Sequence, residues 1–294
     1  MSTLQQPSQS ILHYFQNSIA IFDSGMGSYS VVKAVQKTLP NIKIVYLADR
    51  ASFPYGKMPL KELQQNIQSR LDWLTQTFSP IAIIVASNTP SVTVLDYVHS
   101  TSVLLGVYPP IEAAIHSSSS KEISVLGTKG MVESTPLNLQ IQTLERIHSV
   151  KIRAIEASSL IESMETFQFL NDPIACKLKL KQFFEGIFRQ LPCLDTVTLS
   201  STHLSFLKPF IQELYPHMTC LDPADDVAYT LKQSLEKKRF VQRQTNNCED
   251  SLLVLSTENS LLKLAVKDFE TGLEKLGCVS KVYSISIPNL SSKL

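Results

Sequence analysis

The stretch Ile19-Ala-Ile-Phe-Asp-Ser-Gly-Met-Gly-Ser28 determines the fold class of this chain of 294 residues. Its first four residues are apolar, which is typical of a strand that is buried on both faces. After the polar turn, the apolar residues at positions 31, 32, 35 and 39 keep the spacing of a helix until Pro40 ends it. Ser28 is suited to cap the start of that helix. A buried strand, a turn and a helix in this order predict a βαβ unit.

The same alternation continues along the chain. Apolar runs predict strands at residues 42–47, 81–86, 103–107, 123–126, 150–155 and 196–199, around Cys220, and at 252–255 and 282–285. Helical spacing is found at residues 63–74, after Val132, and at 174–191, 227–235 and 261–276. Strands separated by helices of this kind predict an α/β fold with parallel sheets.

A weak internal similarity predicts two lobes. The segment that begins at Ile19 resembles in layout the segment that begins at Ile123, and residues 83–89 resemble residues 196–203. We expect two similar flavodoxin-like lobes, with the ligand cleft between them at the carboxyl ends of the strands. The expected boundaries are a flexible leader at residues 1–17, lobe A at 18–108 plus 222–286, lobe B at 109–221, and a tail at 287–294, with a surface loop at 240–250.

Composition argues against several classes of protein. The net charge is +1 and no basic face stands out, so neither nucleic acid nor an acidic membrane is an expected partner. The cluster Lys237-Lys238-Arg239 is interpreted as the end of an exposed helix. No apolar run approaches the roughly 20 residues of a membrane helix, and residues 1–17 do not resemble a signal peptide.

The cysteines indicate the compartment. Five of them are scattered without CxxC or metal-ligand spacing: Cys176, Cys193, Cys220, Cys248 and Cys278. An odd number of dispersed cysteines without an export signal predicts reduced thiols and a cytoplasmic protein. The remaining histidines, apart from His203, also lack ligand spacing, so no metal site is expected.

Four polar loops are the candidates for function. They are Asp23 to Ser28, Pro54-Tyr55-Gly56, Ser87-Asn88-Thr89 and Ser201-Thr202-His203. Three of them lie between a predicted buried strand and a helix, where backbone N–H groups favour a carboxylate or a phosphate. Each loop taken alone is equally well explained as an ordinary helix cap or turn.

Two other chemistries are disfavoured by the residues themselves. Gly25-Met26-Gly27 lacks the third glycine of a dinucleotide fingerprint, so no nucleotide cofactor is expected. Ser201 and His203 are imaginable as a hydrolase pair, but residues two apart rarely face each other and the chain has no GxSxG motif.

The four loops taken together resemble the glutamate racemases of the Asp/Glu racemase family. The similarity runs from about residue 19 to 276, with the matching segments in the same order and at similar separations. The segments are Ile21-Phe-Asp-Ser-Gly25, Phe53-Pro-Tyr-Gly56, Ala86-Ser-Asn-Thr-Pro-Ser91, Ile123 to Thr128, Ser159-Leu-Ile-Glu-Ser-Met-Glu165, Asp195-Thr-Val-Thr-Leu-Ser-Ser-Thr-His203 and Leu221-Asp222.

This resemblance implies the Asp/Glu racemase fold and the cofactor-independent interconversion of L- and D-glutamate, which supplies D-glutamate for peptidoglycan. It also implies an acidic amino acid as partner and, more weakly, a homodimer. The two catalytic base positions, which are cysteines in the family, correspond to Ser87 and Ser201, and Asp23 and His203 correspond to the residues that assist them. The implied substrate-binding residues are Ser24, Tyr55, Gly56, Asn88, Thr89 and Thr202.

The chain departs from the family pattern in and around the bases. Both base positions are serine, and their neighbours differ as well: Pro90 stands for a small residue, Ser200 for a glycine, Leu204-Ser205 for an aromatic–proline pair, and Met131 for a threonine expected to face substrate. Changes in the neighbours indicate natural divergence rather than two engineered substitutions.

The acidity of serine limits this chemistry. A cysteine thiol has a pKa near ~8.5, whereas a hydroxyl lies ~5–7 units higher, a difference of roughly 7–10 kcal/mol. Helix-end effects of ~0.3–2 kcal/mol do not close that gap. Two hypotheses follow. In the first, the chain is a racemase of glutamate or a related amino acid that either runs poorly or uses Asp23 and His203 directly as its bases. In the second, it is an inactive homologue that keeps an acidic amino-acid cleft for a binding or regulatory role.

Overall fold

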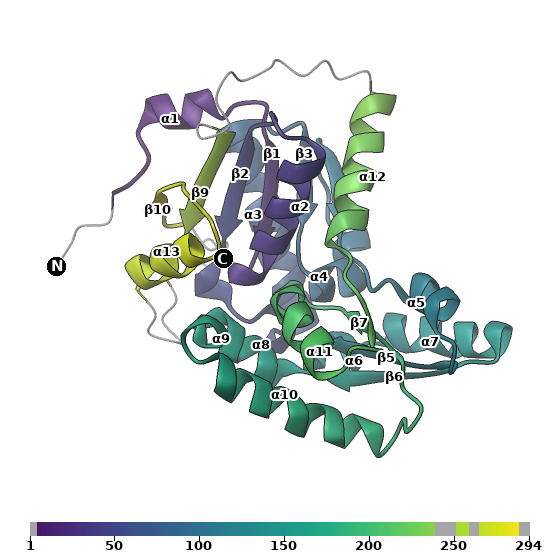
Figure 1. Ribbon diagram of the computed structural model, residues 1–294. Helices are drawn as coiled ribbons and strands as arrows, with labels where there is room; N and C mark the ends of the chain where they lie inside the picture. The colour runs from purple at the N-terminus through teal and green to yellow at the C-terminus, as the bar shows by residue number, and fades with distance from the viewer. Residues whose placement is uncertain (1–4, 239–250, 259–264, 288–294) are drawn as a thin grey trace.

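The computed structural model describes residues 5–238, 251–258 and 265–287, and its strands form two parallel sheets (Figure 1). The first sheet has the order β10-β9-β2-β1-β3-β4 and the second has the order β6-β5-β7-β8. The strands are β1 (Ile19–Asp23), β2 (Ile44–Ala48), β3 (Ala82–Val85), β4 (Val103–Gly106), β5 (Glu122–Gly127), β6 (Lys151–Glu156), β7 (Thr196–Leu199), β8 (Thr219–Leu221), β9 (Leu252–Ser256) and β10 (Val282–Ser284). The predicted α/β fold class is confirmed.

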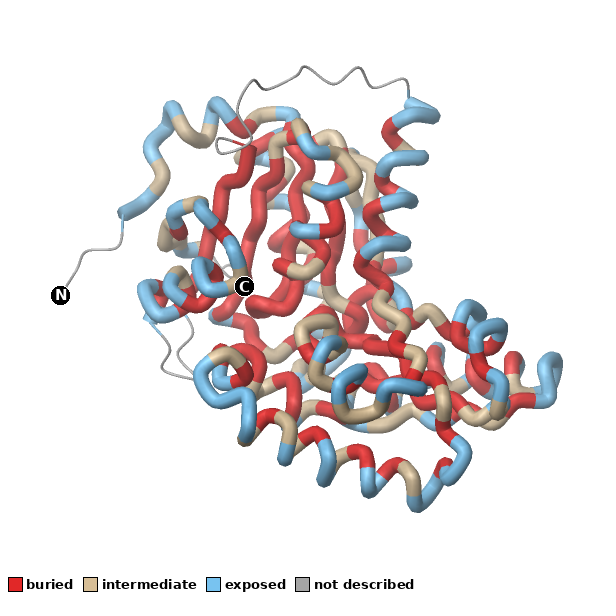
Figure 2. Tube along the Cα trace, in the orientation of Figure 1, coloured by how far each residue is buried: buried red, intermediate tan, exposed pale blue. Residues whose placement is uncertain are grey.

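Helices cover both faces of the first sheet. Ile19 and Ile21 of β1 face the cluster that contains α2 (Tyr29–Thr38) and α12 (Ala224–Lys237), while Ala20 and Phe22 face α3 (Leu60–Phe78). Burial on both faces explains why Ile19 to Phe22 of β1 are all apolar, and Figure 2 shows most strands of this sheet as buried. α13 (Val266–Lys275) packs beside the edge formed by β9 and β10.

The second sheet is covered in the same way. α5 (Ile111–Ser117) and α7 (Thr135–His148) pack on one face, and α8 (Ser158–Glu165), α10 (Pro173–Phe188) and α11 (Lys208–Leu214) pack on the other. The cluster on this second face is continuous with the α2 side of the first sheet. The two sheets are therefore joined by shared apolar packing as well as by the chain.

Short elements make up the connections. They are α1 (Gln9–Tyr14), α4 (Asn88–Thr93), α6 (Lys129–Val132), α9 (Gln168–Asn171), and the 3-10 turns η1 (Met26–Ser28), η2 (Arg50–Ser52), η3 (Tyr55–Lys57), η4 (Leu95–Tyr97) and η5 (Thr202–Leu207).

Two local expectations were wrong. Residues 9–14 of the expected flexible leader form α1. Phe15, the next residue, is buried because its ring packs into the apolar cluster beside α3. Ser28 does not cap α2 with its side chain: it lies inside η1, and its hydroxyl donates to the Gly25 carbonyl instead. The surface loop expected at residues 240–250 and the tail beyond residue 287 lie outside the described residues.

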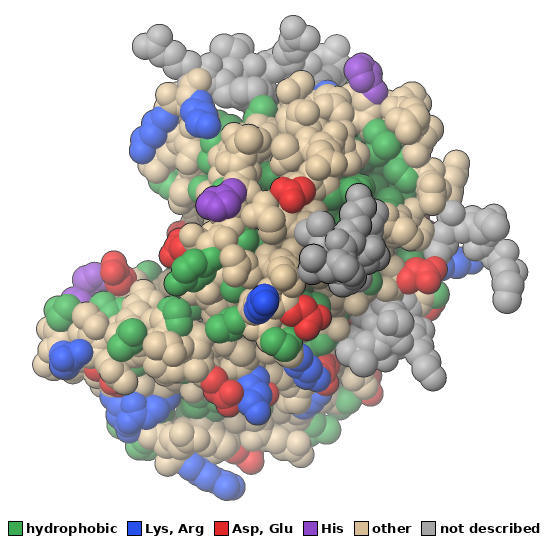
Figure 3. All heavy atoms as spheres, turned by 180° about the vertical axis from the view of Figure 1, so that it is seen from behind, with side chains coloured by type: hydrophobic (Ala, Val, Ile, Leu, Met, Phe, Trp, Pro, Cys, Tyr) green, Lys and Arg blue, Asp and Glu red, His purple; other side chains and the backbone are tan. Residues whose placement is uncertain are grey.

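The surface shows no preference for one sign of charge on the face seen in Figure 3, where Lys and Arg side chains are interspersed with Asp and Glu. Within the described parts of the chain, none of the helices combines the length and the hydropathy needed to cross a membrane.

Candidate functional site

The structure brings the four predicted loops together between the two sheets. Asp23 is the last residue of β1, Ser87 lies between β3 and α4, and Ser201 lies between β7 and η5. The Thr202 hydroxyl donates to Asp23 Oδ2 at 3.1 Å, which joins a loop of the second sheet to a loop of the first. The Tyr55 N–H lies 3.5 Å from Ser24 Oγ and joins a third loop, and a hydrogen bond from Ser87 to Asp23 joins the fourth.

Ser87 and Ser201 occupy equivalent places in the two halves. Each follows the strand that pairs with the first strand of its own half, β3 beside β1 and β7 beside β5. Both residues have extended backbones at the N-terminal cap of the next element, and neither side chain caps it. The two hydroxyls are therefore not used to terminate a helix. This equivalence agrees with the internal similarity seen in the sequence.

Asp23 is buried and lies among hydroxyl groups. Burial raises the pKa of its carboxyl above the usual value, although the charge of His203 and hydrogen bonds from Ser24, Ser87 and Thr202 lower it in part. Asp23 thus contacts both serine-bearing loops, Ser87 directly and Ser201 through its neighbour. It is the carboxylate best placed to accept a proton here.

The raised pKa of Asp23 predicts a dependence of stability on pH. Between the usual pKa and the raised one, the folded protein binds more protons than the unfolded chain, so stability decreases as pH rises through that window. In D23N this loss is removed. We therefore expect D23N to become more stable relative to the native protein as the pH rises from about 4 to about 7, measured as the difference between their free energies of unfolding.

Urea denaturation at several pH values measures this difference. The matched control is D72N, because Asp72 is an exposed aspartate on α3 and its carboxylate stays in water. A difference between D23N and the native protein that does not change with pH would contradict the assignment.

Asn88 is a buried side chain with unused hydrogen-bonding groups. It is 3% exposed, and neither its Nδ2 nor its Oδ1 has a hydrogen-bond partner among the described residues. Leaving a buried amide unpaired costs about 1–3 kcal/mol, so such groups are uncommon. Asn88 lies next to Ser87 at the start of α4, where a bound molecule can pair with it.

His203 is held by a carboxylate that the sequence did not single out. Its Nε2 lies 3.1 Å from Glu165 Oε2, and Arg50 Nε lies 3.2 Å from Glu165 Oε1. Nε2 is thus directed at Glu165. This nitrogen does not form the hydrolase-like pair with Ser201 that the sequence made imaginable. Ser159-Leu-Ile-Glu-Ser-Met-Glu165 was among the resembling segments, but nothing in its spacing identified the carboxylate that contacts the site.

Tyr55 contacts a second buried network. Its hydroxyl donates to Asp49 Oδ2 at 3.1 Å, and Arg70 Nε donates to the same oxygen at 2.8 Å. The Arg70 and Asp49 side chains are 2% and 0% exposed. The Tyr55 hydroxyl is committed to this pair, so its loop can offer a ligand backbone groups rather than the phenol. The sequence analysis identified neither Asp49 nor Arg70.

Two threonines join the two halves of the molecule beside the site. Thr89 and Thr128 share a hydrogen bond of 2.7 Å across the two halves, and the space beside them measures about 10 Å³. That is about the volume that a single water needs. Gly56 lies so close to Thr128 that a Cβ would overlap it, which explains a glycine at the position predicted to bind substrate. Met131, expected near the ligand, is buried against Gly127.

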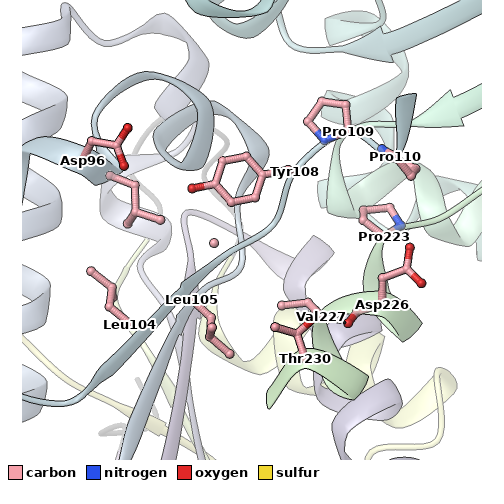
Figure 4. A pocket seen from close by; sticks show the side chains of 12 residues that line it. Asp96, Leu104, Leu105, Tyr108, Pro109, Pro110, Pro223, Asp226, Val227 and Thr230 are labelled. Atoms are coloured by element: carbon pink, nitrogen blue, oxygen red, sulfur yellow. Dashed lines mark hydrogen bonds between the residues drawn. The ribbon is translucent and has the colours of Figure 1, made fainter. Parts of the chain in front are cut away.

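A separate cavity of about 510 Å³ lies where the chain passes from the first sheet to the second (Figure 4). Leu104 and Leu105 of β4 and Val227 of α12 form much of its lining, and the Tyr108 hydroxyl points to the side on which Asp96 lies. Burial and the charge of Asp96 raise the pKa of Tyr108. None of the predicted site residues lines this cavity, so it is distinct from the four loops.

The side chains of the described residues include no group of three His, Cys, Asp or Glu that could hold a metal ion. The polar side chains of the four loops are hydroxyls, one amide, one carboxylate and one imidazole, and Glu165 of α8 contacts the imidazole.

Known proteins resemble this chain in sequence and in structure. A glutamate racemase of Picosynechococcus sp. is 31% identical over 225 residues, which are 75% of this chain and 77% of that relative. The crystal structure of a glutamate racemase isoform from Bacillus anthracis has a TM-score of 0.75 at 24% identity and covers 93% of this chain and 99% of its own. A glutamate racemase from Francisella tularensis in complex with D-glutamate has a TM-score of 0.74 at 20% identity, with 92% and 98% covered. The two structures support the fold. No protein-family model matches the chain.

Proposed function

This chain belongs to the glutamate racemase family, and on that premise we propose that it binds glutamate or a close acidic analogue among its four loops and exchanges the α-hydrogen slowly. The observation that carries the binding proposal is the buried, unpaired amide of Asn88 at the start of α4. An amino acid carboxylate accepts from Nδ2 and an ammonium group donates to Oδ1, so one ligand satisfies both groups.

The slow exchange follows from the two serines. Abstracting an α-hydrogen needs a group whose pKa is near the working pH, and the hydroxyls of Ser87 and Ser201 are far from that range. Asp23 is the carboxylate that contacts both loops, and its raised pKa makes it a better base than a solvated aspartate. A single carboxylate can remove the α-hydrogen from one face of the substrate more readily than from both faces. Inversion needs proton transfer at both faces, so it is expected to be slower than exchange.

The biological role that this proposal implies is the supply of D-glutamate for peptidoglycan in the cytoplasm. The four cysteines in the described residues are free thiols, in keeping with a reducing compartment. If binding persists without exchange, the alternative function is a glutamate-binding or regulatory protein that keeps the architecture of the family.

The experiment is direct. The purified native protein is incubated with L- or D-glutamate in deuterated water, the α-hydrogen is followed by NMR, and binding is measured by calorimetry. Binding with slow exchange supports the proposal. Rapid inversion would contradict the argument from acidity, and the absence of binding would contradict the choice of ligand.

Asn88 provides the sharpest test of the ligand site. Because a hydrogen bond to a charged group contributes about 1.5–3 kcal/mol, N88A is expected to weaken glutamate binding by about 10- to 100-fold. The unliganded variant should be at least as stable as the native protein, because the amide has no partner to lose. Calorimetry and urea denaturation measure the two quantities.

N138A is the matched control for this test. Asn138 is a part-buried asparagine on α7 whose Nδ2 donates to the carbonyls of Val132 and Ser134. It should lose stability and keep its affinity for glutamate, the opposite of N88A. Equal affinities in N88A and the native protein would show that the amide does not face the ligand.

A further inference from the structure

A buried ionic network links the two halves of the molecule behind the site. Arg50 belongs to η2, which follows β2 of the first sheet, while Glu165 ends α8 and His203 lies in η5, both beside the second sheet. The side chains of Arg50 and Glu165 are 0% exposed and that of His203 is 4% exposed. Such a network is costly to bury unless each charged group is compensated by a partner.

The Glu165 carboxylate has a partner for each oxygen. Oε1 accepts from Arg50 Nε at 3.2 Å, and Oε2 accepts the backbone N–H of Met26 at 2.7 Å. Arg50 is held in turn with its guanidinium carbon 4.5 Å from the centre of the Phe269 ring. An arginine stays protonated at all ordinary pH values, so the charge of Arg50 offsets the cost of burying the Glu165 carboxylate away from water.

An ionised carboxylate accepts hydrogen bonds and cannot donate them. Nε2 of His203, 3.1 Å from Oε2, must therefore carry the hydrogen of that contact. When the ring is neutral, this contact selects one tautomer, with the hydrogen on Nε2 and the lone pair on Nδ1. The ring is also packed against Phe53, with the ring centres 5.8 Å apart.

The network also shapes the loop that carries Asp23. A Cβ on Gly25 would overlap Glu165 Oε2, and a Cβ on Gly27 would overlap the His203 ring. The loop can approach this closely because both residues are glycine. The hydrogen bond from the Met26 N–H to Glu165 Oε2 then fixes the distance between this loop and the Glu165–His203 pair.

We propose that Arg50 is a positioning residue which, through Glu165, fixes the tautomer of His203 and the placement of the Asp23 loop. It touches neither predicted base and acts on two of the four loops. The expected effect of Arg50 on ligand binding rests on the proposed function. Its effect on the tautomer of His203 does not depend on whether the protein turns over a substrate.

The test uses ¹⁵N NMR of the histidine rings in the native protein, R50Q, R50K and R70Q without ligand, with the His203 signals assigned from H203Q. We expect Nε2 to carry the hydrogen in the native protein. In R50Q the form protonated on Nδ1 should become populated and exchange of the Nε2 hydrogen with water should accelerate at least about tenfold, because a neutral Glu165 no longer requires a donor. R50K should fall between the two.

R70Q is the matched control, since it breaks the other buried arginine–carboxylate pair and should leave the His203 signals as in the native protein. His203 signals that are the same in R50Q and the native protein would overturn the proposal. If R50Q does not fold, R50M/E165M removes the pair together, which proteins tolerate better than one lone charge, and leaves no side-chain oxygen at position 165 to accept from Nε2. Its His203 ring must still lose the native tautomer, and a native spectrum in this variant would equally overturn the proposal.

Calorimetry with glutamate separates this inference from the proposed function. A tautomer change in R50Q with about tenfold weaker glutamate binding supports both. A native protein that does not bind glutamate, but whose His203 responds to Arg50 as described, contradicts the proposed ligand and leaves the positioning role supported.

Discussion

Replacing Ser87 and Ser201 together with cysteine should raise the rate of α-hydrogen exchange on glutamate by about a thousandfold. The thiol is more acidic than the hydroxyl by ~5–7 pKa units, and about half of such a difference commonly appears in the rate of proton transfer. The two positions are equivalent caps beyond β3 and β7, so the new thiols are expected to lie on opposite sides of the ligand. NMR in deuterated water and polarimetry measure exchange and inversion.

The single variants and a control separate the steps. S87C and S201C should each accelerate exchange mainly from one enantiomer, with little inversion. S102C/S163C adds two thiols at part-buried serines outside the four loops and should match the native protein. A double variant that binds glutamate but does not exchange it would show that residues 87 and 201 do not flank the α-carbon.

Breaking the buried pair of Arg70 and Asp49, which the Tyr55 hydroxyl contacts, should produce the largest loss of stability. R70M leaves Asp49 as a buried charge without its cation, and such a change lowers the free energy of unfolding by about 3–5 kcal/mol. D49N/R70M should recover most of that loss, because both charges are removed and the amide can still accept from the Tyr55 hydroxyl. Urea denaturation at neutral pH measures both.

The surface pair between Lys57 and Glu162 is the matched control. Its side chains are 60% and 41% exposed, so K57M should change stability by at most about 1 kcal/mol. If R70M loses no more stability than K57M, the Asp49–Arg70 pair does not contribute as its burial implies.

The order of strands and helices could be predicted because each element carries its own periodic signal. Ile19 to Phe22 are apolar at every position, and a strand enclosed by α2 on one face and α3 on the other requires that pattern. The start of the chain was misjudged for the opposite reason. Its composition is polar, and only a few apolar side chains, those of Ile11, Leu12 and Phe15, pack in or against the cluster beside α3.

The candidate loops were predictable because their polar residues directly follow buried strands. The residues that support them were not, since each depends on a contact between distant segments. Glu165 is 115 residues from Arg50 and 38 from His203, and no local spacing expresses either relation. Nothing in the sequence beside Arg50 or Arg70 identifies either side chain as buried, and only the fold shows that both are buried against carboxylates.

The hydroxyls at positions 87 and 201 also determine how the site responds to oxidants. Peroxide converts reactive thiolates to sulfenic and sulfinic acids, whereas serine is inert to it. Of the cysteines in the described residues, Cys176, Cys220 and Cys278 are buried and Cys193 is exposed. Among these four, peroxide or an alkylating reagent would reach Cys193 first and would leave both serines unchanged, so the proposed glutamate binding should persist under oxidative stress that would inactivate a site built on two thiols.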